Sequence, residues 1–110
     1  MTSTAMTEAE WQAQLVELAH LLGWRHMHVR RSVGRGRQWT TATNVTGWPD
    51  VFAWHERQRR VLAVELKSEK GRTTPEQDQV LASLAAAGVE VYVWRPSDLD
   101  RAHRVLAGAS

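Results

Sequence analysis

The sequence predicts an α/β fold in which a central mixed β-sheet is flanked by helices. Apolar residues recur at helical spacing within residues 7–22, capping patterns mark the starts of two later helices, and short strand-like segments lie between the helices. The expected order of elements is α-β-β-β-α-β-α. A helix between the third and fourth strands allows a crossover connection, and such connections join parallel strands. The sheet should therefore combine parallel and antiparallel pairs.

The first helix is expected over residues 7–22. Its apolar side chains recur at helical spacing at Trp11, Leu15, Leu18 and Leu22. Thr7 and Glu10 have the spacing of a capping box, and Gly23 is placed to end the helix.

Three strands are expected next, over residues 24–31, 50–54 and 61–67. The charged turn between the last two strands predicts a hairpin. Residues 32–47 contain three glycines and few apolar side chains, so they are expected to form a flexible loop.

The second half of the chain alternates between loop, helix and strand. A basic loop at residues 68–73 precedes the pattern Thr74-Pro75-Glu76-Gln77, which is typical of a helix start, and Gly88 is placed to end that helix. Residues 89–94 are expected to form the fourth strand, and Ser97 to cap a short last helix through about Leu106. The length suits a single domain over residues 1–110.

The composition excludes several kinds of protein. The chain has no cysteine, which excludes disulfides and thiolate metal sites and favours a reducing compartment. The longest apolar runs are far too short to span a bilayer, and the N-terminal residues lack the pattern of a secretory signal. We therefore expect a cytoplasmic protein that does not bind membranes.

Basic residues are unevenly distributed along the chain, although the net charge is only +2. No acidic residue lies between Glu17 and Asp50, and this stretch contains His20, His26, His28, Arg25, Arg30, Arg31, Arg35 and Arg37. Such a segment favours a polyanionic partner, although a solvated arginine-rich surface has the same composition.

The best candidates for contacts with phosphate are Arg35 and Arg37, which lie between glycines in the long loop. The next candidates are Arg30, Arg31, Lys70 and Arg72. Trp39 is expected either to stack on an unpaired base or to pack under the loop.

The chemistry is expected around Asp50, Glu65 and Lys67. Side chains alternate between the two faces of a strand, so Glu65 and Lys67 should project to the same side, and the hairpin can bring Asp50 beside Glu65. Two neighbouring carboxylates repel each other unless a cation joins them, and hard oxygen ligands suit Mg²⁺. Such an ion can polarise a phosphodiester and activate water, and Lys67 can stabilise the developing charge. The pattern fits phosphodiester hydrolysis.

Pro49-Asp50 followed by Glu65-Leu66-Lys67 resembles the PD-(D/E)XK nuclease motif. More narrowly, the chain resembles the virus-type replication-repair nuclease (VRR-NUC) family in its compact, stand-alone phage and bacterial form. The residues that carry this resemblance are Thr7-Glu8, Gln12, Leu22-Gly23-Trp24, His28, Gly47 to Asp50, Glu65 to Lys67, Thr74 to Gln77 and Tyr92 to Pro96.

The resemblance implies a restriction-endonuclease-like fold and an endodeoxyribonuclease, a phosphodiesterase that acts with Mg²⁺ or Mn²⁺. The metal would be held by Asp50, Glu65 and the backbone carbonyl of Leu66. Stand-alone members resemble Holliday-junction resolvases and are expected to be homodimers that act on branched DNA, in a bacterial cell or a phage-infected host. The alternatives are a nucleic-acid-binding module without catalysis and an accessory nuclease subunit that needs a partner protein.

The superfamily often adds a carboxylate from its first helix, where Glu8 and Glu10 are available. At about 100° per residue, Glu8 continues the apolar stripe, whereas Glu10 points away from it and is explained by capping. Glu8 is therefore predicted to join the metal site, with a helix-dipole interaction as the alternative.

Three polar residues keep two interpretations each. Gln12 lies one turn after Glu8 and either hydrogen-bonds the site or flanks the helix. The capping box accounts for Gln77, but the resemblance also places a glutamine here near the active site. His28 either faces the DNA or the site, or is a strand histidine with satisfied hydrogen bonds.

Overall fold

The computed structural model describes residues 6–28, 32–33, 39–40 and 45–108. In chain order the elements are α1 (Glu8–Leu21), β1 (Arg25–His28), β2 (Ser32–Val33), β3 (Trp39–Thr40), β4 (Val51–His55), β5 (Arg60–Leu66), α2 (Pro75–Ala86), β6 (Glu90–Trp94), the 3-10 helix η1 (Pro96–Asp98) and α3 (Leu99–Ala107). Apart from β2, β3 and η1, this order is the predicted one.

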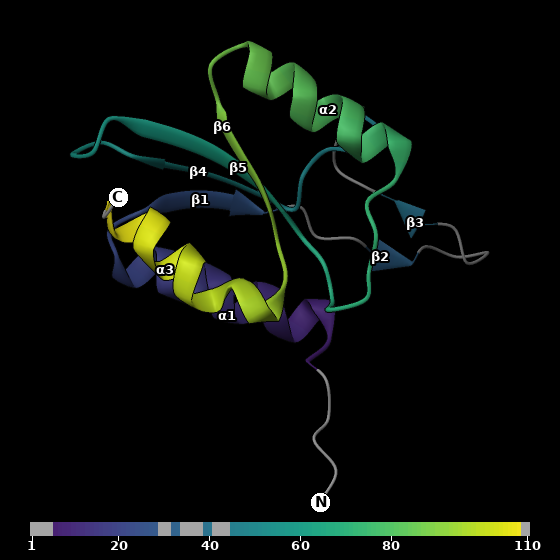
Figure 1. The fold of residues 1–110 in the computed structure, drawn as a ribbon, viewed down its shortest axis with the longest axis horizontal. Coiled ribbons are helices and arrows are strands. Elements are labelled where there is room, and N and C mark those ends of the chain that lie inside the picture. The colour runs from purple at the N-terminus through teal and green to yellow at the C-terminus, as the bar shows by residue number, and fades with distance from the viewer. Residues whose placement is uncertain (1–5, 29–31, 34–38, 41–44, 109–110) are drawn as a thin grey trace, which may run out of the picture.

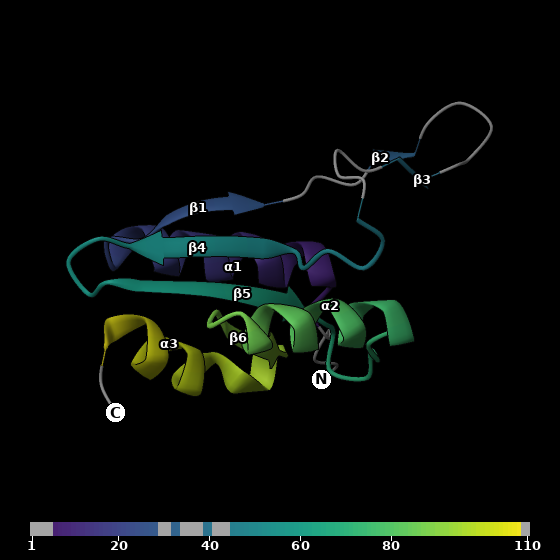
Figure 2. The same ribbon diagram turned by 90° about the horizontal axis from the view of Figure 1, so that it is seen from above.

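The main sheet has the strand order β1-β4-β5-β6. β4 is antiparallel to both β1 and β5, whereas β6 is parallel to β5 because α2 forms the crossover between them (Figure 1). The predicted mixed sheet is therefore confirmed. Helices α1 and α3 lie on one face, and α2 lies on the other (Figures 1 and 2). On the α2 side, the face formed by β1 and β4 is not covered by any described helix (Figure 2).

Two local predictions were wrong. The expected loop over residues 32–47 contains a short antiparallel pair of strands, in which Val33 pairs with Trp39. The last helix does not begin at a Ser97 cap. The Ser97 hydroxyl instead donates a hydrogen bond to Glu69, and the chain passes through η1 before α3 starts. Residues 29–31, 34–38 and 41–44 lie outside the described part of the chain.

The core lies between the sheet and the helix pair α1 and α3. Leu62, Val64 and Leu66 alternate along β5 and are all buried on this face. Trp11 of α1 packs beside them, and its indole Nε1 donates to the Trp94 carbonyl at 3.0 Å. The alternate β5 side chains consequently face α2.

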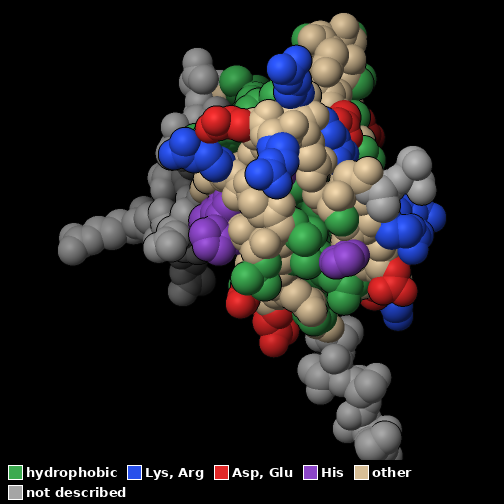
Figure 3. Space-filling view, turned by 90° about the vertical axis from the view of Figure 1, so that its left-hand side faces the viewer, with side chains coloured by type: hydrophobic (Ala, Val, Ile, Leu, Met, Phe, Trp, Pro, Cys, Tyr) green, Lys and Arg blue, Asp and Glu red, His purple; other side chains and the backbone are tan. Residues whose placement is uncertain are grey.

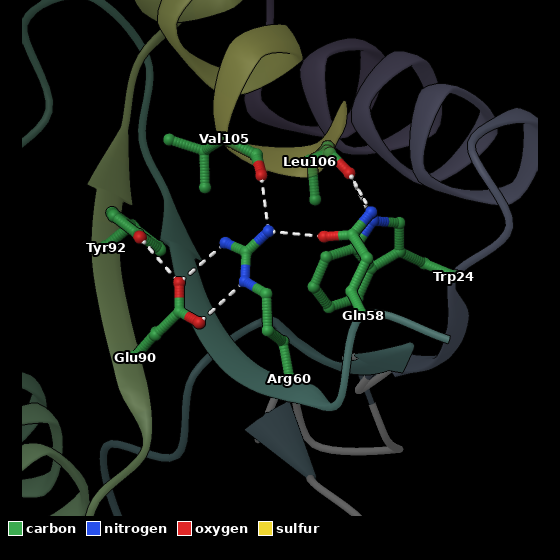
Figure 4. Close-up of polar contacts among 7 residues, drawn as sticks. All are labelled: Trp24, Gln58, Arg60, Glu90, Tyr92, Val105 and Leu106. Atoms are coloured by element: carbon green, nitrogen blue, oxygen red, sulfur yellow. Dashed lines mark hydrogen bonds and ion pairs between the residues drawn. The ribbon is translucent and has the colours of Figure 1, made fainter. Parts of the chain in front are cut away.

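The last carbonyl groups of α3 are capped by side chains from elsewhere in the fold (Figure 4). The Arg60 guanidinium donates to the Val105 carbonyl at 2.7 Å, and the Trp24 indole donates to the Leu106 carbonyl at 2.8 Å. Arg60 also makes two charge-assisted hydrogen bonds to Glu90, at 2.7 and 2.8 Å. These contacts join α3 to β5 and β6 at the end of β5 away from Glu65.

That end of the molecule faces the viewer in Figure 3, where basic and acidic side chains are both present. Among the described helices, none is both long enough and apolar enough to cross a membrane.

Candidate active site

Asp50, Glu65 and Lys67 come together where β4 begins and β5 ends. Lys67 Nζ lies 3.2 Å from Glu65 Oε2, so the two side chains project to the same side, as strand alternation predicted. Asp50 Oδ2 accepts a hydrogen bond of 2.8 Å from the backbone N–H of Leu66, which fixes that carboxylate beside the end of β5. The hairpin register, in which Val51 pairs with Val64, brings the two carboxylates next to each other.

The site is deeply buried for such polar groups. Glu65 is 1% exposed and Lys67 is 7% exposed. Burying a charge is costly unless it is paired and hydrogen-bonded, and this cost explains why the lysine lies against the carboxylate. The face of β5 opposite the core therefore carries an ion pair under α2 rather than a solvated pair of surface charges.

Gln77 both caps α2 and contacts Glu65, so its two interpretations hold together. Its Oε1 accepts from the Thr74 backbone N–H at 2.9 Å, which completes the capping box of α2, and its Nε2 donates to Glu65 Oε2 at 2.9 Å. Because the cap uses the oxygen of the amide, the nitrogen must point toward Glu65. The start of α2 thus fixes both the glutamine and the carboxylate.

Gly47 was predicted as a loop residue and counted in the resemblance without a role of its own, yet it positions the site. Its φ is +89°, and a Cβ atom there would lie 2.6 Å from the backbone carbon and oxygen of Glu76. Only glycine allows both this conformation and this close approach. The segment that leads to Asp50 therefore packs directly on the first turn of α2, next to Gln77. A glycine shortly before Pro49-Asp50 was the available signal in the sequence.

Glu65 has an unusual electrostatic environment for a carboxylate. Burial, and then the negative charge of Asp50, raise the pKa of Glu65 to about 7, although Lys67 opposes this shift. Glu65 Oε2 receives the contacts from Lys67 and Gln77, whereas Oε1 is buried and receives no hydrogen bond from the described residues. A buried oxygen without a donor calls for an explanation. A proton shared with Asp50 satisfies it when Glu65 is protonated. When both carboxylates are ionised, a divalent cation held between them would satisfy it, and this oxygen donor set suits Mg²⁺.

The structure does not bring Glu8 to this site. Glu8 is exposed, so its predicted inward position is wrong. Among the described residues, no three His, Asp or Glu side chains lie close enough together to hold a metal, so Glu8 does not join Asp50 and Glu65 in such a group. Glu8 begins α1, and the first turn of a helix can remain in solvent even on the side that is buried further along. Glu10 forms the predicted capping box with Thr7.

The other predicted residues are dispersed. Gln12 is half-buried, which decides neither of its interpretations. His28 pairs with Val51 and so lies on the sheet face opposite Glu65, not in the site. Lys70 and Arg72 are exposed in the loop after β5. Arg30, Arg31, Arg35 and Arg37 fall outside the described residues.

Substitution of Gly47 tests the contact between the Asp50 segment and α2. Gly88 is a matched control because its φ is +99° but a Cβ there would meet nothing within 4 Å. We expect Gly47→Ala to lower the free energy of unfolding by about 2 kcal/mol more than Gly88→Ala, the typical cost of forcing atoms into a packed region. Urea denaturation measures the difference. Equal losses for the two variants would contradict a packing role for Gly47.

The pKa of Glu65 predicts a pH dependence of stability. The folded-state pKa of about 7 lies above the ordinary value of 4.5. The proton on Glu65 therefore contributes stability that is complete below the lower value and is lost as the pH rises through the higher one. Without divalent cations, the free energy of unfolding of the wild type should fall across this window relative to Glu65→Gln. Urea denaturation at several pH values gives both curves, and parallel curves would show that Glu65 does not titrate in this way.

Comparison with known proteins identifies the family of this chain. The model of the VRR-NUC domain family matches residues 3–98, a range that includes Asp50, Glu65, Lys67 and Gln77. No curated protein and no solved structure gives a match. A VRR-NUC domain implies a nuclease of the PD-(D/E)XK type, with DNA as its substrate. Because the match covers most of the sequence, the chain belongs to the VRR-NUC domain family.

Proposed function

We propose that this protein is a Mg²⁺-dependent DNA endonuclease with the PD-(D/E)XK catalytic arrangement, in which Asp50, Glu65 and the Leu66 carbonyl hold the metal. The observation that carries this proposal is the asymmetry of the Glu65 carboxylate. Oε2 receives contacts from Lys67 and Gln77, whereas the buried Oε1 receives no hydrogen bond from the described residues. A buried carboxylate oxygen that has no hydrogen-bond donor and lies beside a second carboxylate favours a cation-binding role. Mn²⁺ is expected to replace Mg²⁺.

Each protein group has a distinct part in the proposed hydrolysis. A bound divalent cation would polarise the phosphodiester and lower the pKa of the attacking water. Lys67 places a positive charge where negative charge builds on the phosphate. Gln77 keeps Glu65 in one orientation, because its amide is fixed by the helix cap. Glu65 must be ionised to bind a cation, and the adjacent ammonium group favours that form.

The loop after β5 supports contacts with the DNA backbone. Lys70 and Arg72 are exposed on either side of Gly71, whose carbonyl accepts a 2.7 Å hydrogen bond from Arg95. This bond anchors the loop beside Lys67 while leaving the two cations free to meet phosphates. Arg30, Arg31, Arg35 and Arg37 remain proposed contacts on the basis of the sequence.

We further propose a homodimer that acts on branched DNA. The face of β1 and β4 left uncovered by the described helices carries Met27, 54% exposed, with half-buried Phe52 and Trp54, and Val61 of β5 is 40% exposed beside them. Methionine and aromatic side chains are enriched in protein interfaces, whereas surfaces that bind DNA are more polar and positively charged. This composition favours a second copy of the chain as the partner. A two-fold dimer would present two sites to a symmetric junction.

Cleavage of matched DNA structures tests the proposed activity. With Mg²⁺, the wild type should cut a four-way junction faster than a linear duplex of the same sequence. Glu65→Gln should reduce the rate by about 1000-fold, since it removes a charged metal ligand. Asp78→Asn is the control, because it removes an exposed carboxylate of α2, and it should cut like the wild type.

Full activity of Glu65→Gln would refute the site, and equal cutting of both substrates would refute the structural preference. DNA binding without cutting would favour the binding module or accessory subunit.

Sedimentation tests the proposed dimer surface. Met27→Glu places a charge on the uncovered sheet face and should shift the protein from dimer to monomer, whereas Leu21→Glu, at a residue of α1 that is 73% exposed, should not. Circular dichroism establishes that both variants are folded. A wild-type monomer, or a dimer that Met27→Glu leaves intact, would contradict this surface.

A further inference from the structure

β1 carries two histidines on the face of the sheet away from the nuclease site. His26 and His28 are separated by one residue, so both side chains point to the same face. They pair with Ala53 and Val51, which are buried in the core beside α1. The two imidazoles therefore belong to a cluster separate from Glu65, which faces α2.

The spacing of the two rings suits a shared metal ion. Their centroids are 5.6 Å apart and their planes are inclined by 31°. With Zn–N bonds of about 2.0–2.1 Å and tetrahedral geometry, two imidazoles on one ion have centroids roughly 5 Å apart. The observed separation of the two rings is therefore compatible with one nitrogen from each ring on a shared ion.

One nitrogen of each ring has no hydrogen-bond partner among the described residues. The Nδ1 atoms of His26 and His28 are both buried, and within the described part of the chain neither has a partner. Buried ring nitrogens are normally satisfied, so two such atoms on neighbouring rings require a reason. Rotation toward a ligand would break no hydrogen bond to the described residues.

The electrostatics of His26 are compatible with this geometry. Burial lowers the pKa of His26, and the neighbouring imidazoles His28 and His20 lower it further. A lowered pKa favours the neutral form of the ring, which is the form that coordinates metals.

We propose that His26 and His28 bind a transition-metal ion of the Zn²⁺, Ni²⁺ or Cu²⁺ class, with water in the remaining coordination positions. Imidazole suits these ions, whereas the carboxylates and carbonyl of the nuclease site suit Mg²⁺. Water must complete the site because no third His, Asp or Glu among the described residues joins the pair. The ion would hold this part of edge strand β1 in its extended conformation, and its binding to the folded protein would stabilise that state by mass action. This proposal is independent of the nuclease activity.

Calorimetric titration of Zn²⁺ into the protein in excess Mg²⁺ tests the site. We expect His26→Ala and His28→Ala each to weaken Zn²⁺ binding at least tenfold, the effect of losing one of two protein ligands. His103→Ala, which removes an exposed histidine of α3, should bind Zn²⁺ like the wild type. Unchanged binding by both strand variants, or an equal loss in His103→Ala, would overturn the proposal.

A measurement on the wild type keeps the proposal testable if a strand variant fails to fold. Zn²⁺ should shift the imidazole NMR signals of His26 and His28 and leave those of His20, His55 and His103 in place. Equal shifts of all five histidines would show adventitious binding and reject the site.

Discussion

Glu65 places an ionisable carboxylate in the interior of the protein, between β5 and α2, where only 1% of its surface meets solvent. Such a group can remain buried only if neighbouring groups compensate for its lost hydration. Lys67 supplies the opposite charge, and Gln77 supplies a hydrogen bond through an amide that the helix cap has already oriented. The placement of α2 against the sheet is therefore linked to the chemistry of one side chain.

The two ends of the sheet use charged residues differently. At the end away from Glu65, Arg60 and Glu90 form a closed pair, and Arg60 and Trp24 cap the last carbonyls of α3 (Figure 4). Those contacts stabilise the fold, and the charged groups that make them already have partners within the protein. At the other end, burial and then the neighbouring carboxylate of Asp50 raise the pKa of Glu65, so its ionised form weakens the fold in the absence of a cation. Such unfavourable arrangements are typical of functional sites.

Features set by short-range rules could be predicted from the sequence. The alternation of side chains along one strand was enough to place Glu65 and Lys67 together, and both capping boxes followed from a spacing of three residues. The hairpin that brings Asp50 beside them followed from two neighbouring strands.

Features that depend on the packing of distant elements could not be predicted. The helical wheel gives the side of α1 on which Glu8 lies, but not that the first turn stays in solvent. The contact from Gln77 to Glu65 requires the position of α2 over the sheet, and the close approach of Gly47 requires the same information. His28 was not assigned to a face because strand pairing had to be known first.

Crystals of the protein soaked in Mn²⁺ would show directly whether the Asp50–Glu65 pair binds a divalent cation, because the anomalous scattering of manganese locates the ion. We expect a peak within bonding distance of Asp50 and of Glu65 Oε1, and no such peak in crystals of Glu65→Gln. A peak found only elsewhere, or one that persists between these residues in Glu65→Gln, would contradict the proposed site.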